Sequence, residues 1–349
     1  MASVLVGMSG GVDSSVAAAL LVEAGHEVVG VTLKLWGGDS DTGCCSVSDV
    51  DDARRVAQQL DIDHLVFNFT EDFDRHVVDP YVRAHVDGQT PNPCIECNRH
   101  LKFDRLSRRA EQLGFDAVAT GHHARIVDVD GVHRVARGAD AAKDQSYVVH
   151  MLDQATLAAT LFPVGTMTKA AVRSEAARLG LRTAGKADSQ DVCFITKSGR
   201  ESFLGARIPL RAGRVVDPSG SVVGEVSAVE LVTIGQRRGL GLGGGDPEVY
   251  AIDVNVASAT VTVGPRSQLL RTAAIATRMA WSAEPVRGAF RAQISAHGAS
   301  VACQVEPSTD GRQVVITWSE AQRRVAPGQS VVLYDEADQF VLGGGVAAS

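Results

Sequence analysis

The sequence lacks the long hydrophobic segments that membrane proteins carry. No apolar run in its 349 residues reaches the roughly 18 residues that a membrane-spanning helix needs. The first residues, MASVLVGMS, also lack the basic stretch and the small-residue cleavage site of a secretory signal, and they are typical of a β-strand instead. We therefore expect a cytoplasmic protein with no membrane partner.

An excess of basic residues is also absent. The formal net charge is −7 and the isoelectric point is about 5.8, which argues against a generally basic protein that binds any nucleic acid. A local basic patch is still compatible with this charge. The sequence shows no long-period repeat and no low-complexity segment, and its length predicts two or three domains.

Cysteine is scarce, with six in the whole chain. In a reducing cytosol such cysteines are typical of thiols, metal ligands or catalytic groups rather than of a disulfide framework. Cys303 alternates with Val301 and Val305 in a strand pattern, which predicts a core residue. The other five are Cys44, Cys45, Cys94, Cys97 and Cys193.

The first half alternates short apolar runs with helical patterns. Ser48 or Asp49 would cap the second helix, and Pro80 would kink or interrupt the third. Continuous apolar strands that alternate with helices predict a parallel sheet covered on both faces, with ligands beyond the carboxyl ends of its strands. The expected strands cover residues 4–6, 28–35, 64–69 and 116–121, and the expected helices cover 14–24, 48–60, 71–86 and 99–114.

The pattern changes near residue 205. Residues 213–225 are typical of a hairpin, and residues 248–264 alternate with period two as a half-exposed strand pair does. From about Ala273 to the end, short β runs separated by turn clusters predict a small antiparallel barrel. We therefore expect three domains: a catalytic α/β domain over 1–203, a small central α+β domain over 204–271 and a β-barrel over 272–349.

The segment GMSGGVDSS, residues 7–15, separates the first expected strand from the first expected helix. Backbone N–H groups at a helix start attract anions, and glycines let the backbone approach an anion closely. The loop therefore suits a phosphate or a pyrophosphate. Asp13 would repel that anion, so we expect it to hold Mg²⁺ or to orient the loop. A plain strand-to-helix turn is the alternative.

Two well-known phosphate loops do not fit this segment, since it has no G-x-x-x-x-G-K-[ST] and its glycine spacing is not G-x-G-x-x-G. It resembles the PP-loop, S-G-G-x-D-S, of ATP pyrophosphatases. That resemblance implies cleavage of ATP between its α and β phosphates, with AMP left on a substrate oxygen.

Two further segments, TPNPCIECN and GKADSQDVCFI, carry Cys94, Cys97 and Cys193. A helix that begins near Cys97, with cations after it, would favour the thiolate form of that residue, so Cys97 and Cys193 are candidate catalytic thiols. Two alternatives remain open but are not favoured. One is zinc held by Cys94, Cys97 and the adjacent pair Cys44 and Cys45, which are poorly spaced for zinc. The other is an iron–sulfur cluster on Cys94, Cys97 and Cys193.

Together these segments resemble the MnmA family of tRNA-specific 2-thiouridylases. A PP-loop alone occurs in many enzymes, whereas its combination with both cysteine motifs and GQRRGLG is highly specific. The matching stretches run in order over residues 7–241: GMSGGVDSSVAA, CCS with DARRVAQQL, TPNPCIECN, KFD, ATGHHAR, KDQSYVV, FPVG, KADSQDVCFI and TIGQRRGLG.

The resemblance implies a tRNA-uridine 2-sulfurtransferase that uses Mg·ATP to adenylate the C2 oxygen of the wobble uridine of tRNA. Persulfide sulfur then replaces AMP, which gives 2-thiouridine, AMP and pyrophosphate. Cys193 would carry the persulfide, supplied by a sulfur-donor protein such as a cysteine desulfurase or a sulfur carrier. Cys97 would release the sulfur, leaving a Cys97–Cys193 disulfide for a reductant to reopen.

The resemblance also implies binding residues, position by position. Asn92, Pro93 and Cys94 would face the target base, and Lys143, Asp144 and Gln145 would contact the tRNA. Leu33 and Gly121 would contact the adenine or the ribose through their backbones. The phosphates of ATP would be bound by Gly7, Met8, Ser9, Gly10, Gly11, Val12, Asp13 and Ser14.

The chain departs from the family pattern at two places. Some members have Asp at the position of Cys94, which makes Cys97 the catalytic thiol and Cys94 the dispensable one. Some members also contact tRNA through an Arg-x-Arg in the barrel, where this chain has Ser295, Ala296 and His297, so that contact is not carried over.

Two other functions compete with the thiouridylase hypothesis. A PP-loop ligase or amidotransferase would adenylate a small metabolite and would need neither RNA nor cysteines. A zinc- or cluster-bearing RNA-binding module would bind RNA without turnover. Dependence of pyrophosphate release on tRNA separates the first from the hypothesis, and metal content together with ATP binding separates the second.

Overall fold

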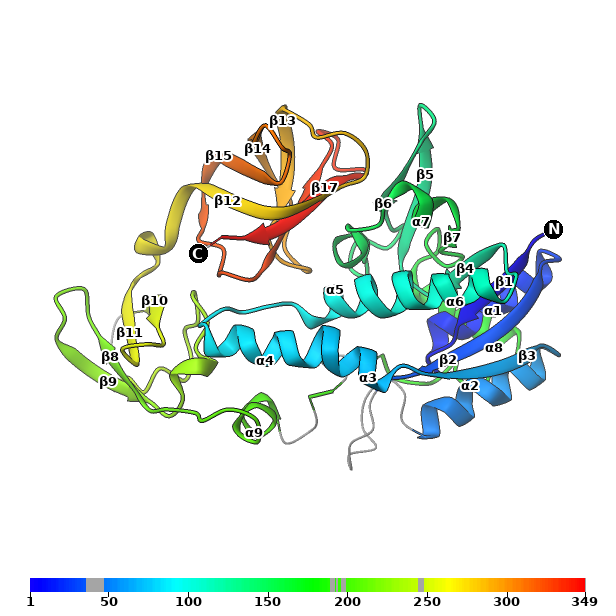
Figure 1. Ribbon diagram of the computed structural model, residues 1–349, viewed down its shortest axis with the longest axis horizontal. Coiled ribbons are helices and arrows are strands. Elements are labelled where there is room, and N and C mark those ends of the chain that lie inside the picture. Colours follow the sequence, from blue (N-terminus) through cyan, green and yellow to red (C-terminus); the bar gives the residue numbers. More distant parts are fainter. Residues whose placement is uncertain (36–46, 189–191, 193, 196–198, 244–247, 349) are drawn as a thin grey trace.

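Five parallel strands form the sheet at the centre of the N-terminal half (Figure 1). The computed structural model describes residues 1–35, 47–188, 192, 194–195, 199–243 and 248–348. The strand order is β3-β2-β1-β4-β7, so the first strand lies in the middle of the sheet. The strands span Ser3–Gly7 (β1), Glu27–Lys34 (β2), Asp63–Asn68 (β3), Ala117–Thr120 (β4) and Thr160–Leu161 (β7).

Helices cover both faces of this sheet, as the apolar strands predicted. They span Val12–Glu23 (α1), Val47–Gln59 (α2), Thr70–Phe73 (α3), Asp79–Val86 (α4), Pro93–Cys97 (α5), Leu106–Gln112 (α6), Gln154–Ala158 (α7), Lys169–Arg178 (α8) and Gly199–Gly205 (α9). Val4 and Val6 of β1 pack on one face with α1, α2 and α8, whereas Leu5 packs on the other face with α4, α5 and α6. The alternation of side chains along a strand thus supplies both layers of the core.

Two helical rods run side by side across the middle of the molecule (Figure 1). One joins α3 to α4 through a π-helical stretch, Asp74–Val78, and the other joins α5 to α6 through Asn98–Arg105. Pro80 follows the first π-helical stretch closely. A proline cannot donate the helical hydrogen bond and its ring crowds the preceding turn, so the regular α pattern gives way there. The predicted interruption is confirmed, although the rod continues.

Two predicted helix starts are wrong. Helix α2 already includes Val47, so Ser48 and Asp49 lie in its first turn and do not cap it. The helix expected over 99–114 is already helical at Pro93, because a proline suits the first turn and Asn92 caps it. The structure therefore moves this second start upstream of both cysteines of the C-x-x-C segment.

A four-stranded sheet with the order β10-β11-β8-β9 forms the central part of the chain. It contains the predicted hairpin, Gly213–Val216 (β8) with Val222–Val226 (β9), and the predicted pair, Val249–Asn255 (β10) with Thr260–Pro265 (β11). Both pairs are antiparallel, as expected. Short 3₁₀ helices span Ser146–Val149, Val229–Leu231 and Arg266–Leu269.

The C-terminal residues form the predicted barrel, which is closed and antiparallel in the order β12-β15-β14-β13-β16-β17. Cys303 lies in its apolar core, and burial raises the pKa of its thiol to about 12, so this cysteine is the inert core residue that the sequence predicted. The strands span Leu270–Trp281 (β12), Gly288–Gln293 (β13), Val301–Pro307 (β14), Gln313–Arg323 (β15), Ser330–Tyr334 (β16) and Val341–Ala347 (β17).

A hairpin that the sequence analysis did not predict stands between the parallel sheet and the barrel (Figure 1). It consists of Ala124–Val129 (β5) and Val132–Arg137 (β6), and Ala136 forms an isolated bridge with Phe340 of the barrel. Its turn residues, Asp130 and Gly131, both have positive φ, at 54° and 81°. Asp-Gly suits this two-residue turn because such a turn needs left-handed backbone at both positions.

The expected domain boundaries stay predictions. The boundary after residue 203 falls within α9, and the boundary after residue 271 falls within β12. Helices in the described part of the chain are all too short or too polar to cross a bilayer.

Candidate active site

A cavity of about 400 Å³ opens at the carboxyl end of the parallel sheet. The ends of β1, β2 and β4 bound it, which is where open α/β sheets bind ligands. Its size falls in the range of small-molecule sites, roughly 300–1,000 Å³. Of the candidate residues, the following line it: Gly7, Met8, Ser9, Gly11, Val12, Asp13, Ser14, Leu33, Gly121, Lys143, Asp144 and Gln145.

Serine hydroxyls hold the loop between β1 and α1. The hydroxyl of Ser14 accepts a hydrogen bond from the amide of Ser9 at 3.2 Å and lies 3.2 Å from the carbonyl of Gly11. Ser15 donates to the same carbonyl at 2.8 Å. The first amides of a helix have no acceptor within the helix, so the start of α1 presents positive partial charge to the cavity that it lines.

Two glycines allow this loop to pack closely on its neighbours. A Cβ on Gly121 would lie 2.6 Å from the backbone of Asp13 and Ser14, at the start of α1. Gly10 has a φ of +71°, and a Cβ there would collide with the backbone of Asp49 on α2. Gly10 does not line the cavity itself. Its role in the structure is to let the loop pack closely against α2.

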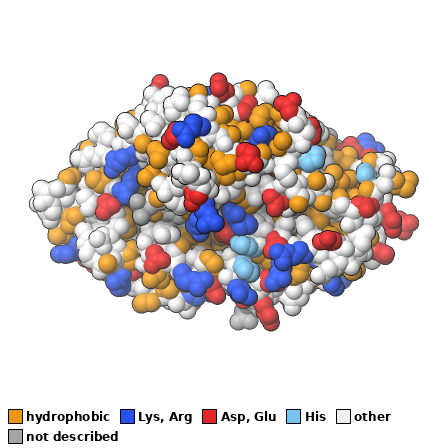
Figure 2. Space-filling model, turned by 45° about the horizontal axis from the view of Figure 1, so that its top comes forward, with side chains coloured by type: hydrophobic (Ala, Val, Ile, Leu, Met, Phe, Trp, Pro, Cys, Tyr) orange, Lys and Arg blue, Asp and Glu red, His pale blue; other side chains and the backbone are white. Residues whose placement is uncertain are grey.

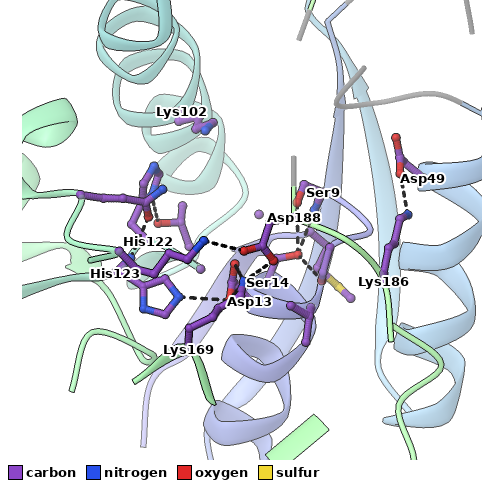
Figure 3. Close-up of a pocket in the computed structure, with 18 of the residues that line it drawn as sticks. Ser9, Asp13, Ser14, Asp49, Lys102, His122, His123, Lys169, Lys186 and Asp188 are labelled. Atoms are coloured by element: carbon purple, nitrogen blue, oxygen red, sulfur yellow. Dashed lines mark hydrogen bonds and ion pairs between the residues drawn. The ribbon is translucent and has the colours of Figure 1, made fainter. Parts of the chain in front are cut away.

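A series of alternating charges crosses the cavity (Figure 3). Lys169 donates to both carboxylate oxygens of Asp13, at 2.8 and 2.7 Å, and its Nζ lies 2.9 Å from Asp188. Lys143 contacts the other oxygen of Asp188 at 2.8 Å, and Nε2 of His123 lies 3.1 Å from Asp13. The fold thus joins five segments that lie far apart in the sequence into one network.

Both carboxylates of this network are held in their ionised form. Burial opposes the ionisation of Asp13, but hydrogen bonds from His123 and Lys169 outweigh it and lower its pKa. Burial also opposes the ionisation of Asp188, and Lys143 and Lys169 lower its pKa far below the usual range. Asp13 is therefore fixed by the charge of Lys169 and by its hydrogen bond with His123, which fits the expected role of orienting the loop.

Lys186 ties another segment to the glycine loop. Its Nζ lies 2.6 Å from Asp49 and 2.8 Å from Asp52, both on α2, and it donates to the carbonyl of Gly10 at 3.0 Å. The residues before position 189 are therefore anchored at two points of the cavity wall, through Lys186 and through Asp188.

The predicted tRNA residues at 143–145 differ in their surroundings. Lys143 is exposed beyond its contact with Asp188. The carboxylate of Asp144 accepts hydrogen bonds from Arg137, Gly138 and Ser146. Gln145 accepts from the amide of His123 at 2.8 Å and so holds the residue that contacts Asp13. Asp144 and Gln145 thus have bonds within the chain that shape the cavity wall.

The candidate cysteine segment lies outside this cavity. Asn92, Pro93, Cys94 and Cys97 are absent from the described residues that line it. Asn92 instead caps α5 by accepting from the amide of Cys94 at 3.1 Å, and Cys94 is exposed. The expectation that a helix starts at Cys97 is wrong, because the cap and Pro93 place the start four residues earlier.

Cys97 nevertheless shares an apolar cluster with Phe194. It is 7% exposed and belongs to an apolar cluster that also contains Leu33, Leu35 and Phe194. Phe194 packs edge-on against Phe73, with ring centroids 5.6 Å apart. Cys193 itself lies outside the described residues, as do Cys44 and Cys45.

The metal alternatives remain untested. Among the described residues, no three His, Cys, Asp or Glu side chains gather as a metal site would require. The zinc and iron–sulfur proposals each need Cys44, Cys45 or Cys193, which the structure does not describe.

The sequence analysis missed Lys169, whose side chain is only 12% exposed. Helix α8 begins at this lysine, after Thr168 accepts a cap bond from Ala171 at 3.2 Å. A threonine cap followed by a lysine was readable in the sequence, but its partner Asp13 lies 156 residues away. Only the fold could show that this helix start faces the glycine loop.

Family models match nearly the whole chain. The model described as the tRNA methyl transferase HUP domain matches residues 2–197. The models described as the tRNA methyl transferase PRC-barrel domain and the aminomethyltransferase beta-barrel domain match residues 201–265 and 271–347. The three matches follow one another along the chain without overlap.

Curated relatives match over their full length. The tRNA-specific 2-thiouridylase MnmA of Chloroflexus aurantiacus is 45% identical, and that of Chloroflexus aggregans is 46% identical; each match covers 99% of this chain and 98% of the relative. A solved 4-thiouridine synthetase–RNA complex with bound ATP shares 21% identity over 55% of this chain and 44% of its own, with a TM-score of 0.38, which is too low to bear on chemistry. At such identity over such lengths to its curated relatives, this chain belongs to the MnmA family of tRNA-specific 2-thiouridylases.

Proposed function

We propose that this protein is an ATP-dependent tRNA-uridine 2-sulfurtransferase. The observation that carries the proposal is the cavity at the start of α1, whose wall is the Gly7–Ser14 loop, in a chain that shares 45% identity with a 2-thiouridylase over its full length. The descriptions of two of the matching family models name a tRNA methyl transferase. A loop shaped for phosphates and two cysteine segments favour sulfur transfer, because methyl transfer requires neither.

The first step activates the uridine of tRNA. A pyrimidine carbonyl oxygen is a very poor leaving group, so it must first become a phosphate ester. The C2 oxygen attacks the α-phosphorus of ATP, the bond between the α-phosphorus and its bridging oxygen breaks, and pyrophosphate leaves. The N-terminus of α1 and Lys169 supply positive charge where the departing pyrophosphate gains negative charge.

Mg²⁺ would accompany the nucleotide. Carboxylate and phosphate oxygens are its preferred ligands. Both oxygens of Asp13 already accept hydrogen bonds from Lys169. Phosphate oxygens and water would therefore supply most of its coordination, and Asp13 would keep the loop in place.

The second step replaces AMP by sulfur. The terminal sulfur of a persulfide on Cys193, loaded by a cysteine desulfurase or a sulfur carrier, attacks C2, and the C–O bond to AMP breaks. The thiolate of Cys97 attacks the inner sulfur, the persulfide S–S bond breaks, and a Cys97–Cys193 disulfide remains for a reductant. The apolar cluster shared by Cys97 and Phe194 supports this pairing, since Phe194 follows Cys193 directly.

The tRNA would lie along the face where the barrel meets the helical rods. Figure 2 shows lysine, arginine and histidine side chains gathered in the middle of this face of an otherwise acidic protein. Basic side chains supply most of the affinity for phosphate backbones. The cavity is too small for a duplex, so the target uridine would enter flipped out of its stack. Asn92, Pro93 and Cys94 would face the base, while Lys143 would contact the backbone beside Asp144 and Gln145.

Reconstitution tests the proposal. Purified protein with tRNA, Mg·ATP and a persulfide donor should yield 2-thiouridine, AMP and pyrophosphate in equal amounts. Cys97→Ser and Cys193→Ser should abolish thiolation, whereas Cys94→Ser should retain it and serves as the matched control. Thiolation at the wild-type rate by Cys97→Ser or by Cys193→Ser would refute the persulfide assignment. Pyrophosphate release that is indifferent to tRNA would indicate a ligase or amidotransferase that adenylates a small metabolite.

A further inference from the structure

Arg137, the last residue of β6, joins the catalytic domain to the barrel. Its side chain is 20% exposed, and its guanidinium makes short contacts in several directions. It lies 2.9 Å from Asp144 on its own side of the boundary. On the barrel side it lies 2.7 Å from Gln293 and 2.7 Å from Asp338, and it stacks over the ring of Tyr334 at 3.6 Å.

The contact with Asp144 reaches the cavity through the catalytic domain. Asp144 also accepts from the amide of Gly138 at 2.8 Å and so fixes the loop that carries Lys143 and Gln145. Gln145 holds His123, and His123 contacts Asp13 of the glycine loop. Arg137 is therefore linked to the start of α1 by three hydrogen-bonded contacts and one peptide bond. The contacts are Arg137–Asp144, Gln145–His123 and His123–Asp13, and the peptide bond joins Asp144 to Gln145.

The contact with Gln293 reaches the same cavity through the barrel. While its oxygen accepts from Arg137, its amide nitrogen donates to the carbonyls of Ser295 and Ala296, at 2.8 and 3.2 Å. The next residue, His297, lines the cavity. The barrel thus contributes one wall of the cavity, and the same guanidinium holds that wall and the Lys143–Gln145 wall.

We infer that Arg137 is a positioning residue that makes the barrel part of the adenylation site, so that its bridge between the two cavity walls sets the rate of pyrophosphate release rather than the affinity for RNA. This inference rests on the proposed function. A guanidinium is planar, carries five N–H donors and stays charged, so it can hold Asp144, Gln293 and Asp338 together. A lysine would retain the charge but not these divergent bonds.

Arg134 offers a matched control on the same strand. It also docks the barrel, donating to Ser282 at 2.7 Å and lying over the ring of Phe340 at 5.4 Å. Its described contacts do not include Asp144 or Gln293. Arg134→Met therefore weakens barrel docking without touching either cavity wall.

The test measures tRNA-dependent pyrophosphate release at saturating ATP and tRNA. Arg137→Met should lower kcat at least about 10-fold with little change in the Kd for tRNA, and Arg137→Lys should restore part of the loss. Asp338→Asn removes only the barrel-side ion pair, at a residue with a φ of 58° that asparagine tolerates, and should give a smaller fall. Arg134→Met should stay within about 2-fold of the wild type. A kcat unchanged in Arg137→Met, or a change confined to tRNA binding, overturns the inference.

Hydrogen exchange supplies a readout that needs no substrate. In Arg137→Met the amides of residues 143–145 and 295–298 should exchange faster, whereas in Arg134→Met they should match the wild type. If the amides of both segments exchange in Arg137→Met as slowly as they do in the wild type, the inference is also overturned. A wild-type protein that releases no pyrophosphate with any tRNA, yet shows the exchange pattern, would instead refute the proposed function alone.

Discussion

Lys169 is the side chain on which the charge balance of the cavity depends. It donates to both oxygens of Asp13 and contacts Asp188. Without it, two ionised carboxylates would face the phosphates of a nucleotide with less compensation. Lys169→Met should lower kcat for pyrophosphate release about 100-fold, equivalent to about 2.7 kcal/mol, because it removes positive charge at the leaving group. Lys169→Arg should recover part of the rate.

A variant of the same helix controls for loss of charge. Arg178 lies at the other end of α8 and pairs with Glu23 and Glu175 at the surface. Arg178→Met removes one positive charge there and should leave pyrophosphate release at the wild-type rate. A slow Arg178→Met variant, or a fast Lys169→Met variant, would contradict the role given to Lys169.

Gly121 tests the close packing of the loop. Its missing side chain leaves room for the backbone of Asp13 and Ser14, which a Cβ would approach to 2.6 Å. Gly121→Ala must displace the start of α1, and such overpacking costs about 1–3 kcal/mol. The Kd for ATP, measured by calorimetry, should rise at least about 10-fold. Gly185→Ala, where a Cβ meets open space, should bind ATP as the wild type does.

At the scale of residues, the sequence predicted what lies within one motif and missed what lies between motifs. The Gly7–Ser14 loop was predicted from its place between a strand and a helix start, whereas Leu33 and Gly121 were implied by the family resemblance. All of these residues except Gly10 line the cavity. The bonds of Lys169 and the anchoring of Asp144 by Arg137 depend on contacts across the fold. The surroundings expected for Cys97 were wrong because the helix was expected to start at the basic residues after it. Asn92 and Pro93 instead start the helix before Cys97.

At the scale of elements, Asn92 is given two roles, and one pair of variants separates them. It caps α5 and is also proposed to face the target base. Asn92→Ala should lower the free energy of unfolding by about 1 kcal/mol, as loss of an N-cap does. Asn92→Asp keeps the accepting oxygen and should be as stable as the wild type. Thiolation by Asn92→Asp at the wild-type rate would show that the cap suffices and would contradict contact with the base through the amide.

Element types were predicted more reliably than element ends. The parallel strands and the antiparallel pairs followed from period and from apolar runs, which are local properties of the sequence. The start of α2 was misplaced because the helix already includes Val47, upstream of the polar residues that usually cap. The β5–β6 hairpin was missed although VDVDGVHRV alternates around Asp-Gly, since the run continues directly from the ATGHHAR motif.

At the scale of the whole molecule, the barrel and the catalytic domain share one apolar cluster. Tyr147 and Val149 pack there with Val332 and Tyr334. His150 lies at the same boundary, where a Cβ on Gly344 of β17 would collide with its ring. Because this apolar contact holds the barrel against the catalytic domain, the barrel can form one wall of the cavity that opens at the end of the parallel sheet.

His150 makes this boundary sensitive to acid. Burial lowers the pKa of its imidazole from 6.5 to about 4. The unfolded chain therefore takes up a proton below pH 6.5 that the folded chain refuses, and stability that is complete above pH 6.5 falls as the pH drops toward 4. The loss is about 3 kcal/mol at about 1.36 kcal/mol per pKa unit. Chemical denaturation at several pH values should show this slope, and His150→Gln should flatten it. An equal slope in both proteins would contradict a buried neutral His150.

The central claim is that the uridine oxygen itself is adenylated in the cavity beside α1. The most direct measurement uses tRNA whose wobble uridine carries ¹⁸O at C2, with Mg·ATP and a persulfide donor. Because the C2 oxygen bonds to the α-phosphorus and leaves with it, the account predicts ¹⁸O in the phosphate of AMP, one atom for each 2-thiouridine formed. Unlabelled AMP alongside complete thiolation would contradict it.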